Sequence, residues 1–354
     1  MRGQELKIRR YQKRKSMRAM RRLSQLKKTR RNANHYLNLE SATSLQSFQN
    51  DKPIIVKAPE VFDLINNTKG TTAYFAEVQR KISRCMPKSH LFFDLSETKS
   101  VSVDAIMYLI ALIYNTKKIQ LLGINCSGNE PREKSALDTL NQAGFFQYVS
   151  SRFFHPTDRD NKRIKIVRGD GLDNKLAARL CDFVHTHSIG RVGKRETRRL
   201  YAMLIELMSN THQHAYKNLI DISPKMNCNW YIYVVDKDDY IEFVFLDTGI
   251  GIPKTIRRTW QEKLTDVILT ANDAYYIASA LRGEFRTETK EYHRGKGLPE
   301  IYSNIQRASI ASLAILSGKG MCKIDSSGKI FENTIDSEFQ GALFKWHISK
   351  EAVS

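Results

Sequence analysis

The chain has 354 residues, 41% of them hydrophobic, and a formal net charge of +20 at pH 7. This length can hold two domains of ordinary size, each with its own core. No apolar run reaches the roughly 18 residues of a membrane helix, and no secretory signal follows the basic N-terminus, so we expect no membrane anchor. Five cysteines without a C-x-x-C pair argue against a disulfide framework or zinc site and favour the reducing cytoplasm.

The positive charge is concentrated at the N-terminus. Residues 1–31 hold fourteen Lys or Arg and one acidic residue, Glu5, for a net charge of +13. Such an arm neutralises nucleic-acid phosphates, so we expect it to bind RNA or DNA. A solvated tail, a site for an acidic protein and an Arg-rich transit peptide are the alternatives. Residues 32–50 are polar and without period, so residues 1–50 are predicted to form a basic arm and linker.

Residues 51–150 alternate strand and helix patterns. Strands are predicted at 53–57, 90–96 and 119–125, and helices at 71–84, around 103–113 and at 131–143. Gly144 closes the last of these helices, as is common. Strand, helix and strand joined by short connections predict parallel pairing with a right-handed crossover, and hence a small α/β domain.

The segments DLSETKSVSVDAI and LNQAGFFQYV within this range resemble the STAS domain of anti-sigma-factor antagonists. The resemblance places Asp104 where that family carries a regulated phosphoserine, and Ala105 in place of a glycine. A carboxylate at this position cannot accept phosphate from a kinase as the serine would, so we expect a STAS-like scaffold or docking surface. The alternative role of Asp104 is a favourable charge at a helix N-terminus.

After a predicted linker at 151–162, residues 163–354 contain a helical stretch, LYAMLIELMSNTHQHAYKN, at 200–218. Glu206, Asn210 and His214 fall at i, i+4 and i+8, beside an apolar stripe that includes Leu204. A carboxylate next to an amide suits a metal-bound phosphate, because the amide oxygen can bind Mg²⁺ and the carboxylate can orient a nucleophile. A surface helix with polar residues is the alternative.

Two glycine-containing segments follow. In IEFVFLDTGIGIP a predicted strand, 240–247, ends at Asp247 and is followed by Gly249 and Gly251. It pairs in a predicted hairpin with the strand at 229–235. The second segment precedes a predicted helix that begins with PEIY, and glycines there let backbone N–H groups approach a phosphate. It consists of Arg294, Gly295, Lys296, Gly297 and Leu298.

The order E-x-x-x-N, D-x-G-x-G and G-x-G-L resembles the GHKL ATPase superfamily, and SNTHQHAYKN is most similar to its anti-sigma-factor kinases. The resemblance implies a Bergerat-type α/β sandwich, a mixed sheet with helices on one face, and a lid at about 254–294. It implies that Glu206 orients water, Asn210 binds Mg²⁺ and Asp247 accepts the adenine amino group. His214 belongs to the same helix motif, Gly249 and Gly251 turn against the base, and Arg294–Leu298 form the phosphate loop. Ala342 departs from the family, which often has Thr there.

The sequence therefore predicts an ATP- and Mg²⁺-binding regulatory switch with slow hydrolysis, whose nucleotide state controls engagement of a protein or nucleic-acid partner. A serine/threonine kinase is one alternative, and it would need a substrate in another chain. A nucleic-acid-binding protein in which ATP acts as a gating ligand is the other, favoured by residues 1–31. Relatives in the superfamily commonly form dimers, so we also consider a homodimer.

Overall fold

The computed structural model describes residues 52–149, 161–188, 192–214, 229–260, 271–285, 297–306 and 310–350, all of which belong to one compact unit. The predicted basic arm, its linker and nearly all of the linker predicted at 151–162 lie outside these residues. None of the described helices combines the length and apolar composition of a membrane span.

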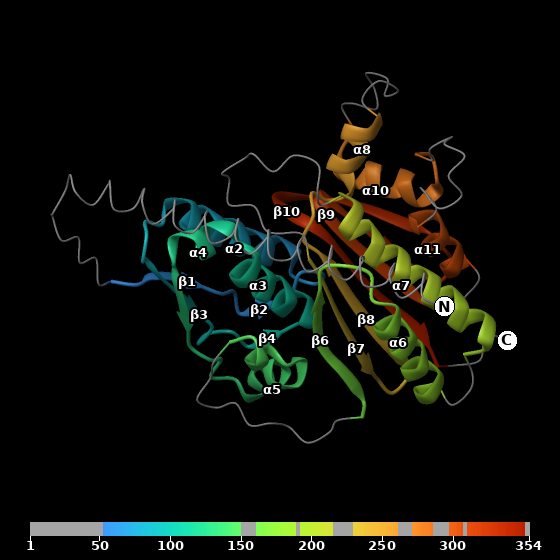
Figure 1. Cartoon of the computed structure of the whole chain (residues 1–354), viewed down its shortest axis with the longest axis horizontal. Helices are drawn as coiled ribbons and strands as arrows, with labels where there is room; N and C mark the ends of the chain where they lie inside the picture. Colours follow the sequence, from blue (N-terminus) through green and yellow to red (C-terminus); the bar gives the residue numbers. More distant parts are fainter. Residues whose placement is uncertain are drawn as a thin grey trace, which may run out of the picture. The chain divides into compact units, whose positions relative to one another are not determined.

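The N-terminal part, residues 52–149, contains a three-stranded parallel sheet in the order β1-β3-β5 and a short parallel pair of β2 with β4 (Figure 1). The predicted parallel arrangement is therefore confirmed. Its elements are β1 (Ile54–Lys57), β2 (Val61–Phe62), α2 (Thr68–Arg84), β3 (His90–Asp94), β4 (Ser100–Val101), α3 (Val103–Asn115), α4 (Lys117–Leu122), β5 (Asn125–Gly128), α5 (Lys134–Ala143) and the 3₁₀ turn η1 (Phe145–Gln147).

The strand predicted at 119–125 is wrong. Most of that range belongs to the short helix α4, which ends at Gly123 in the left-handed conformation, with φ of 60°. The strand β5 begins only at Asn125. A short apolar run has no distinguishing period, so helix and strand cannot be told apart from it. Leu121 is 74% exposed, so this run is not the buried strand that its composition suggested.

The C-terminal part, residues 161–350, contains a five-stranded sheet in the order β6-β7-β8-β10-β9. Its elements are β6 (Arg163–Gly169), α6 (Asn174–His187), α7 (Lys194–His214), β7 (Trp230–Asp236), β8 (Tyr240–Asp247), α8 (Ile252–Trp260), α10 (Asp273–Arg282), α11 (Gly297–Gln306), β9 (Ser312–Ile324) and β10 (Ile330–Ser349). The predicted hairpin of β7 with β8 is confirmed, whereas α8 was not predicted.

The predicted mixed sheet is wrong, because all neighbouring strands of this sheet are antiparallel. The physical reason is that β9 and β10 form a hairpin. Strand β9 lies at the edge of the sheet, and the chain then turns back so that β10 lies between β9 and β8 and pairs with both. Such hairpins need only a short connection, whereas a parallel neighbour would need a crossover.

The two faces of the five-stranded sheet are both buried. Along β8, Ile241, Phe243 and Phe245 pack with α6, α7, α10 and α11, while Val244 and Leu246 alternate to the other face. On that reverse face the sheet meets α2 and α3 of the N-terminal part (Figure 1). The helices α6, α7, α10 and α11 of the C-terminal part therefore lie on one face, as predicted. The cover of the other face by the N-terminal part was not predicted, and through it the two parts share a core.

The range predicted as a lid, 254–294, includes most of α8 and all of α10. Helix α10 is held in the core: Tyr276, Ile277 and Leu281 are fully buried, and the helix packs on β9. Arg257 on α8 joins it through an ion pair with Asp273, 2.6 Å between Nη2 and Oδ1. This section of the range is therefore a structural layer, and 261–270 and 286–294 lie outside the described residues.

Candidate functional site

A row of four side chains crosses the sheet where β8 ends. The strand registers place Trp230, Asp247, Ala342 and Ser317 opposite one another on β7, β8, β10 and β9. Since side chains alternate along a strand, Asp247 lies on the same face as Phe245, which is the face covered by α7. Ala342, the neighbour of Asp247 on β10, is a small buried residue. The motif aspartate therefore faces the helix layer, not the N-terminal part.

Asp247 is a half-buried carboxylate with a perturbed acidity. Its Oδ1 accepts a hydrogen bond from the Gly249 N–H at 2.7 Å. Burial raises the pKa of Asp247 to about 7, and the Gly249 hydrogen bond lowers it only in part. A carboxylate in such a position can accept a hydrogen bond from an amino group when it is ionised, and its charge changes near neutral pH.

The turn after Asp247 depends on close backbone packing. Gly251 has φ of 86°, and a Cβ there would lie 2.7 Å from Ser317 Oγ. Gly341 has φ of 99°, and a Cβ there would lie 2.0 Å from the Asp247 carbonyl oxygen. Ser317 Oγ donates to the Gly341 carbonyl at 2.6 Å and accepts from Ile252 N–H at 2.9 Å. These contacts hold the turn against β9 and β10.

Sequence reasoning missed Ser317 as part of this turn. Its hydroxyl meets Gly251 and Gly341 through cross-strand register, and no local motif marks it. The only available signal was the alternation along β9: Ser317 is a polar residue at a position where Leu313 and Ile315, four and two residues earlier, face the core.

Glu206 and Asn210 lie on one edge of α7, and both are half-buried. The buried stripe of this helix includes Leu204 and Leu207. At about 100° per residue, Asn210 lies at one edge of that stripe, next to the buried Met203, and Glu206 lies one step further from it. Helix α6 packs against α7, and Cys181 Sγ on α6 lies 3.6 Å from the Thr197 carbonyl oxygen.

Helix α11 lies on the other side of α7, which runs between α6 and α11 (Figure 1). The motif residue Gly297 begins α11, and Leu298 packs against the core of the helix-covered face. The structure thus places described residues of all three motif segments on one face of the sheet. Arg294, Gly295 and Lys296 lie outside the described residues, and the side chain of His214 is likewise not described.

The described residues form no cluster of three or more His, Cys, Asp or Glu side chains that could hold a metal ion. Mg²⁺ commonly uses only one or two protein ligands, because substrate phosphates and water supply the others. The Asn210 amide beside the Glu206 carboxylate fits that limited requirement.

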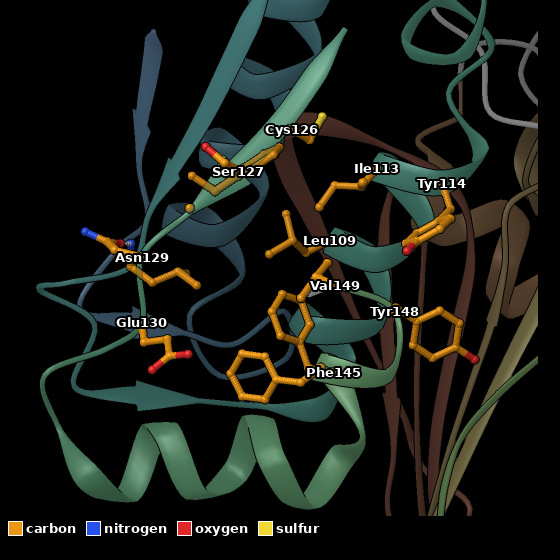
Figure 2. Close-up of a pocket in the computed structure, with 14 residues that line it drawn as sticks. Leu109, Ile113, Tyr114, Cys126, Ser127, Asn129, Glu130, Phe145, Tyr148 and Val149 are labelled. Atoms are coloured by element: carbon orange, nitrogen blue, oxygen red, sulfur yellow. Dashed lines mark hydrogen bonds between the residues drawn. The ribbon is translucent and has the colours of Figure 1, made fainter. Parts of the chain in front are cut away.

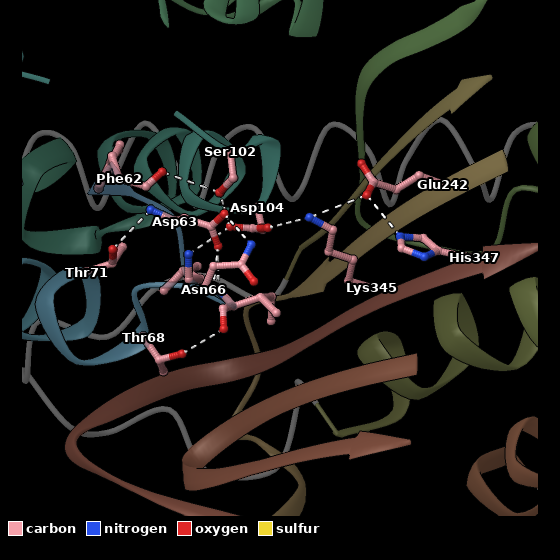
Figure 3. A network of polar contacts seen from close by, with 12 residues as sticks. Phe62, Asp63, Asn66, Thr68, Thr71, Ser102, Asp104, Glu242, Lys345 and His347 are labelled. Atoms are coloured by element: carbon pink, nitrogen blue, oxygen red, sulfur yellow. Dashed lines mark hydrogen bonds and ion pairs between the residues drawn. The ribbon is translucent and has the colours of Figure 1, made fainter. Parts of the chain in front are cut away.

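Asp104, the residue at the predicted phosphoserine position, is fully buried in the first turn of α3. Its carboxylate accepts hydrogen bonds from the Leu64 N–H at 2.9 Å and from the Ser102 hydroxyl, and it pairs with Lys345 Nζ at 3.2 Å (Figure 3). The carboxylate is therefore inaccessible to a docking partner. It joins the N-terminal part to β10 instead.

A second polar contact links α3 to the motif segment. Asn115 Nδ2, at the last residue of α3, donates to Thr248 Oγ1 at 3.3 Å. Thr248 follows Asp247 directly, and its hydroxyl also accepts from the Asn229 N–H at 2.9 Å. Both Asn115 and Thr248 are fully buried. The N-terminal part therefore contacts the residue next to the candidate binding carboxylate.

No protein-family model matches this chain, and no curated protein matches it as a relative. The fold class is α/β. The N-terminal part has a three-stranded parallel sheet, and the C-terminal part has a five-stranded antiparallel sheet.

Proposed function

We propose that the protein is an ATP- and Mg²⁺-binding regulatory switch of GHKL type, with a STAS-like N-terminal part. The observation that supports this most is the position of Asp247. The carboxylate stands at the tip of a central strand, on the helix-covered face, next to Ala342 and a glycine turn. Helix α7, with Glu206 and Asn210 on one edge, and the start of α11 lie on that same face.

In this proposal each motif residue has one task. Ionised Asp247 accepts a hydrogen bond from the adenine amino group, and the turn at Gly249 and Gly251 lies against the base. Asn210 holds Mg²⁺, which neutralises charge on the phosphates. Glu206 orients a water molecule for slow hydrolysis. The N-terminus of α11 directs backbone N–H groups and a positive dipole at the phosphates, with Arg294–Leu298 as the loop.

Ala342 supplies no hydroxyl beside the base. The nearest hydroxyl in the same row, Ser317, is committed to Gly341 and Ile252. We therefore propose that the adenine is held chiefly by Asp247 and by shape, with the apolar side chains of Trp230 and Ala342 flanking the carboxylate.

A titration of purified protein with labelled ATP, with and without Mg²⁺, tests the proposal by reading affinity and product together. Asp247→Asn should abolish binding with the fold preserved. Asp238→Asn, an exposed carboxylate in the hairpin at the other end of the same strand, is the matched control. Glu206→Ala should bind ATP but release no phosphate. Unchanged binding by Asp247→Asn would refute the assignment.

A nucleic-acid-binding protein in which ATP is a gating ligand is the second candidate, and the net charge of +13 on residues 1–31 favours it. Deleting residues 1–31 should then remove salt-dependent retention of RNA or DNA while ATP binding remains. For a kinase, transfer of label from ATP to an added protein is the distinguishing result. Asp104 is buried and carries no hydroxyl, so the position that holds the phosphoserine in STAS domains cannot serve as the phosphate acceptor here.

A further inference from the structure

A pocket of about 900 Å³ lies in the N-terminal part, between strand β5, helix α3 and the segment that follows α5 (Figure 2). Its lining is mainly apolar and aromatic, with Leu109 and Ile113 from α3 and Phe145 and Val149 from the segment after α5. This volume falls within the range of roughly 300–1,000 Å³ that is typical of small-molecule sites. It is built from different elements than the proposed nucleotide site.

One edge of the pocket is an open strand. Among the described strands β5 pairs only with β3. The N–H groups of Asn125 and Asn129 donate to the carbonyl oxygens of Ser89 and Phe93, at 2.9 Å and 3.2 Å. Because backbone groups alternate along a strand, the carbonyl of Cys126 and the N–H of Gly128 point to the opposite edge. Both residues line the pocket. Among the backbone groups on this edge, the Cys126 carbonyl is an acceptor and the Gly128 N–H is a donor, two residues apart.

Three polar side chains around the pocket, those of Asn129, Ser127 and Tyr148, make hydrogen bonds within the protein. Asn129 accepts from the Leu95 N–H at 2.6 Å and donates to Asp94 Oδ1 at 2.7 Å. Ser127 Oγ lies 2.6 Å from His90 Nε2, and the Tyr148 hydroxyl donates to the Ile166 carbonyl at 3.1 Å. These hydrogen bonds fix the wall of the pocket. The Cys126 carbonyl and the Gly128 N–H, in contrast, point away from β3 toward the open edge of β5.

Gly128 packs closely against β3. A Cβ at this position would lie 2.5 Å from the Phe93 carbonyl oxygen, so a larger residue would disturb the pairing of β5 with β3. The position of the β5 backbone beside the pocket therefore depends on a residue without a side chain.

We propose that this pocket binds a small planar heteroaromatic molecule that carries an N–H donor and an adjacent acceptor. The N–H would donate to the Cys126 carbonyl, and the acceptor would receive the Gly128 N–H. The ring system would lie among Leu109, Ile113 and Phe145, where its burial supplies most of the affinity. The proposal does not depend on ATP binding.

Calorimetric titration of the full chain with quinolin-2-one tests the proposal, and N-methylquinolin-2-one serves as the matched probe. The N-methyl compound has the same rings but lacks the donor, so it should bind about threefold to tenfold more weakly. The site is located by alkylation of Cys126, followed by peptide mass spectrometry. Quinolin-2-one should slow this reaction.

Two substitutions that fill the pocket complete the test. Leu109→Trp should abolish binding, and Val149→Trp at the rim provides a second variant if the first fails to fold. Leu121→Trp is the control, because Leu121 is exposed on α4 and does not line the pocket. It should bind like the unmodified chain. Absence of binding by the unmodified chain, equal binding of both probes, or undiminished binding by a folded pocket-filling variant would overturn the proposal.

Discussion

Lys345 on β10 reaches Asp104 on α3, with 3.2 Å between Nζ and Oδ2. Lys345 also lies 3.5 Å from Glu242, which in turn contacts His347 Nε2 at 3.1 Å (Figure 3). Burial alone would lower the pKa of Lys345, but the carboxylates of Asp104 and Glu242 outweigh it and raise that pKa above its ordinary value. One buried cation therefore serves two carboxylates across the junction between the two parts of the fold.

Replacing Lys345 with Met should lower the free energy of unfolding by about 3–5 kcal/mol, because the Asp104 carboxylate is left buried without its partner. Urea denaturation followed by circular dichroism measures this. Adding Asp104→Asn to Lys345→Met should recover part of the loss, since the uncompensated charge is removed. Lys69→Met is the control: Lys69 pairs with Asp336 at 3.8 Å on the surface, where the pair contributes about 0–1 kcal/mol. Equal losses for Lys345→Met and Lys69→Met would contradict the buried pair.

The stability of the protein should depend on pH through Asp247. Its folded pKa of about 7 lies above the ordinary value of about 3.9 for an unfolded aspartate. The stabilising contribution of this group is therefore complete below pH 4 and is lost as the pH rises through 7. Asp247→Asn should accordingly be more stable than the unmodified chain at pH 8, by a few kcal/mol, with the gap closing near pH 4. Denaturation series at both pH values measure the gap, and a gap independent of pH would refute the shift.

Gly341→Ala should destabilise the turn after Asp247. The new Cβ would lie 2.0 Å from the Asp247 carbonyl oxygen, at a backbone φ of 99° that is unfavourable for alanine. We expect a loss of about 1–3 kcal/mol and, under the proposed function, weaker ATP binding. Gly171→Ala is the matched control, because a Cβ at Gly171 meets nothing within 4 Å. Thermal melts compare the two, and similar melting temperatures would show that the close contact relaxes without cost.

Asn115→Ala should weaken ATP binding, although Asn115 lies on α3, on the face of the sheet opposite to the proposed nucleotide site. It removes the hydrogen bond to Thr248, the neighbour of Asp247, while the bonds between Thr248 and Asn229 remain. We expect ATP affinity to fall about threefold to tenfold, the usual equivalent of one hydrogen bond. Asn125→Ala, an exposed asparagine on β5, should leave affinity unchanged. If the chain binds ATP and Asn115→Ala binds it equally well, α3 does not position this segment.

Residues 163–354 expressed without the N-terminal part should aggregate. Their sheet would expose a reverse face that the N-terminal part covers in the full chain, which includes Tyr231, Val244, Leu246, Leu316 and Leu343. Contiguous apolar patches of this kind promote association. Size-exclusion chromatography and dye binding measure the effect against residues 52–354. A monomeric, dye-free fragment would show that the shared core is dispensable.

Sequence patterns alone located most helices and strands of both parts, because those patterns are local. A period of 3.6 residues marked α7, alternation with a final carboxylate marked β8, and glycine after an amphipathic run marked the end of α5. The same patterns identified Glu206, Asn210 and Asp247 as candidate site residues. They failed at residues 119–125, where a short apolar run has no period long enough to separate helix from strand.

Only the tertiary structure decided which of these residues meet. Lys345 and Asp104 are 241 positions apart, and Ser317 reaches Gly341 through strand register, so no local period encodes either contact. The antiparallel sheet and the burial of both its faces likewise depend on how separated segments pack. Local periodicity depends on residues a few positions apart, whereas burial, ion pairing and a raised pKa depend on the whole fold that removes a group from water.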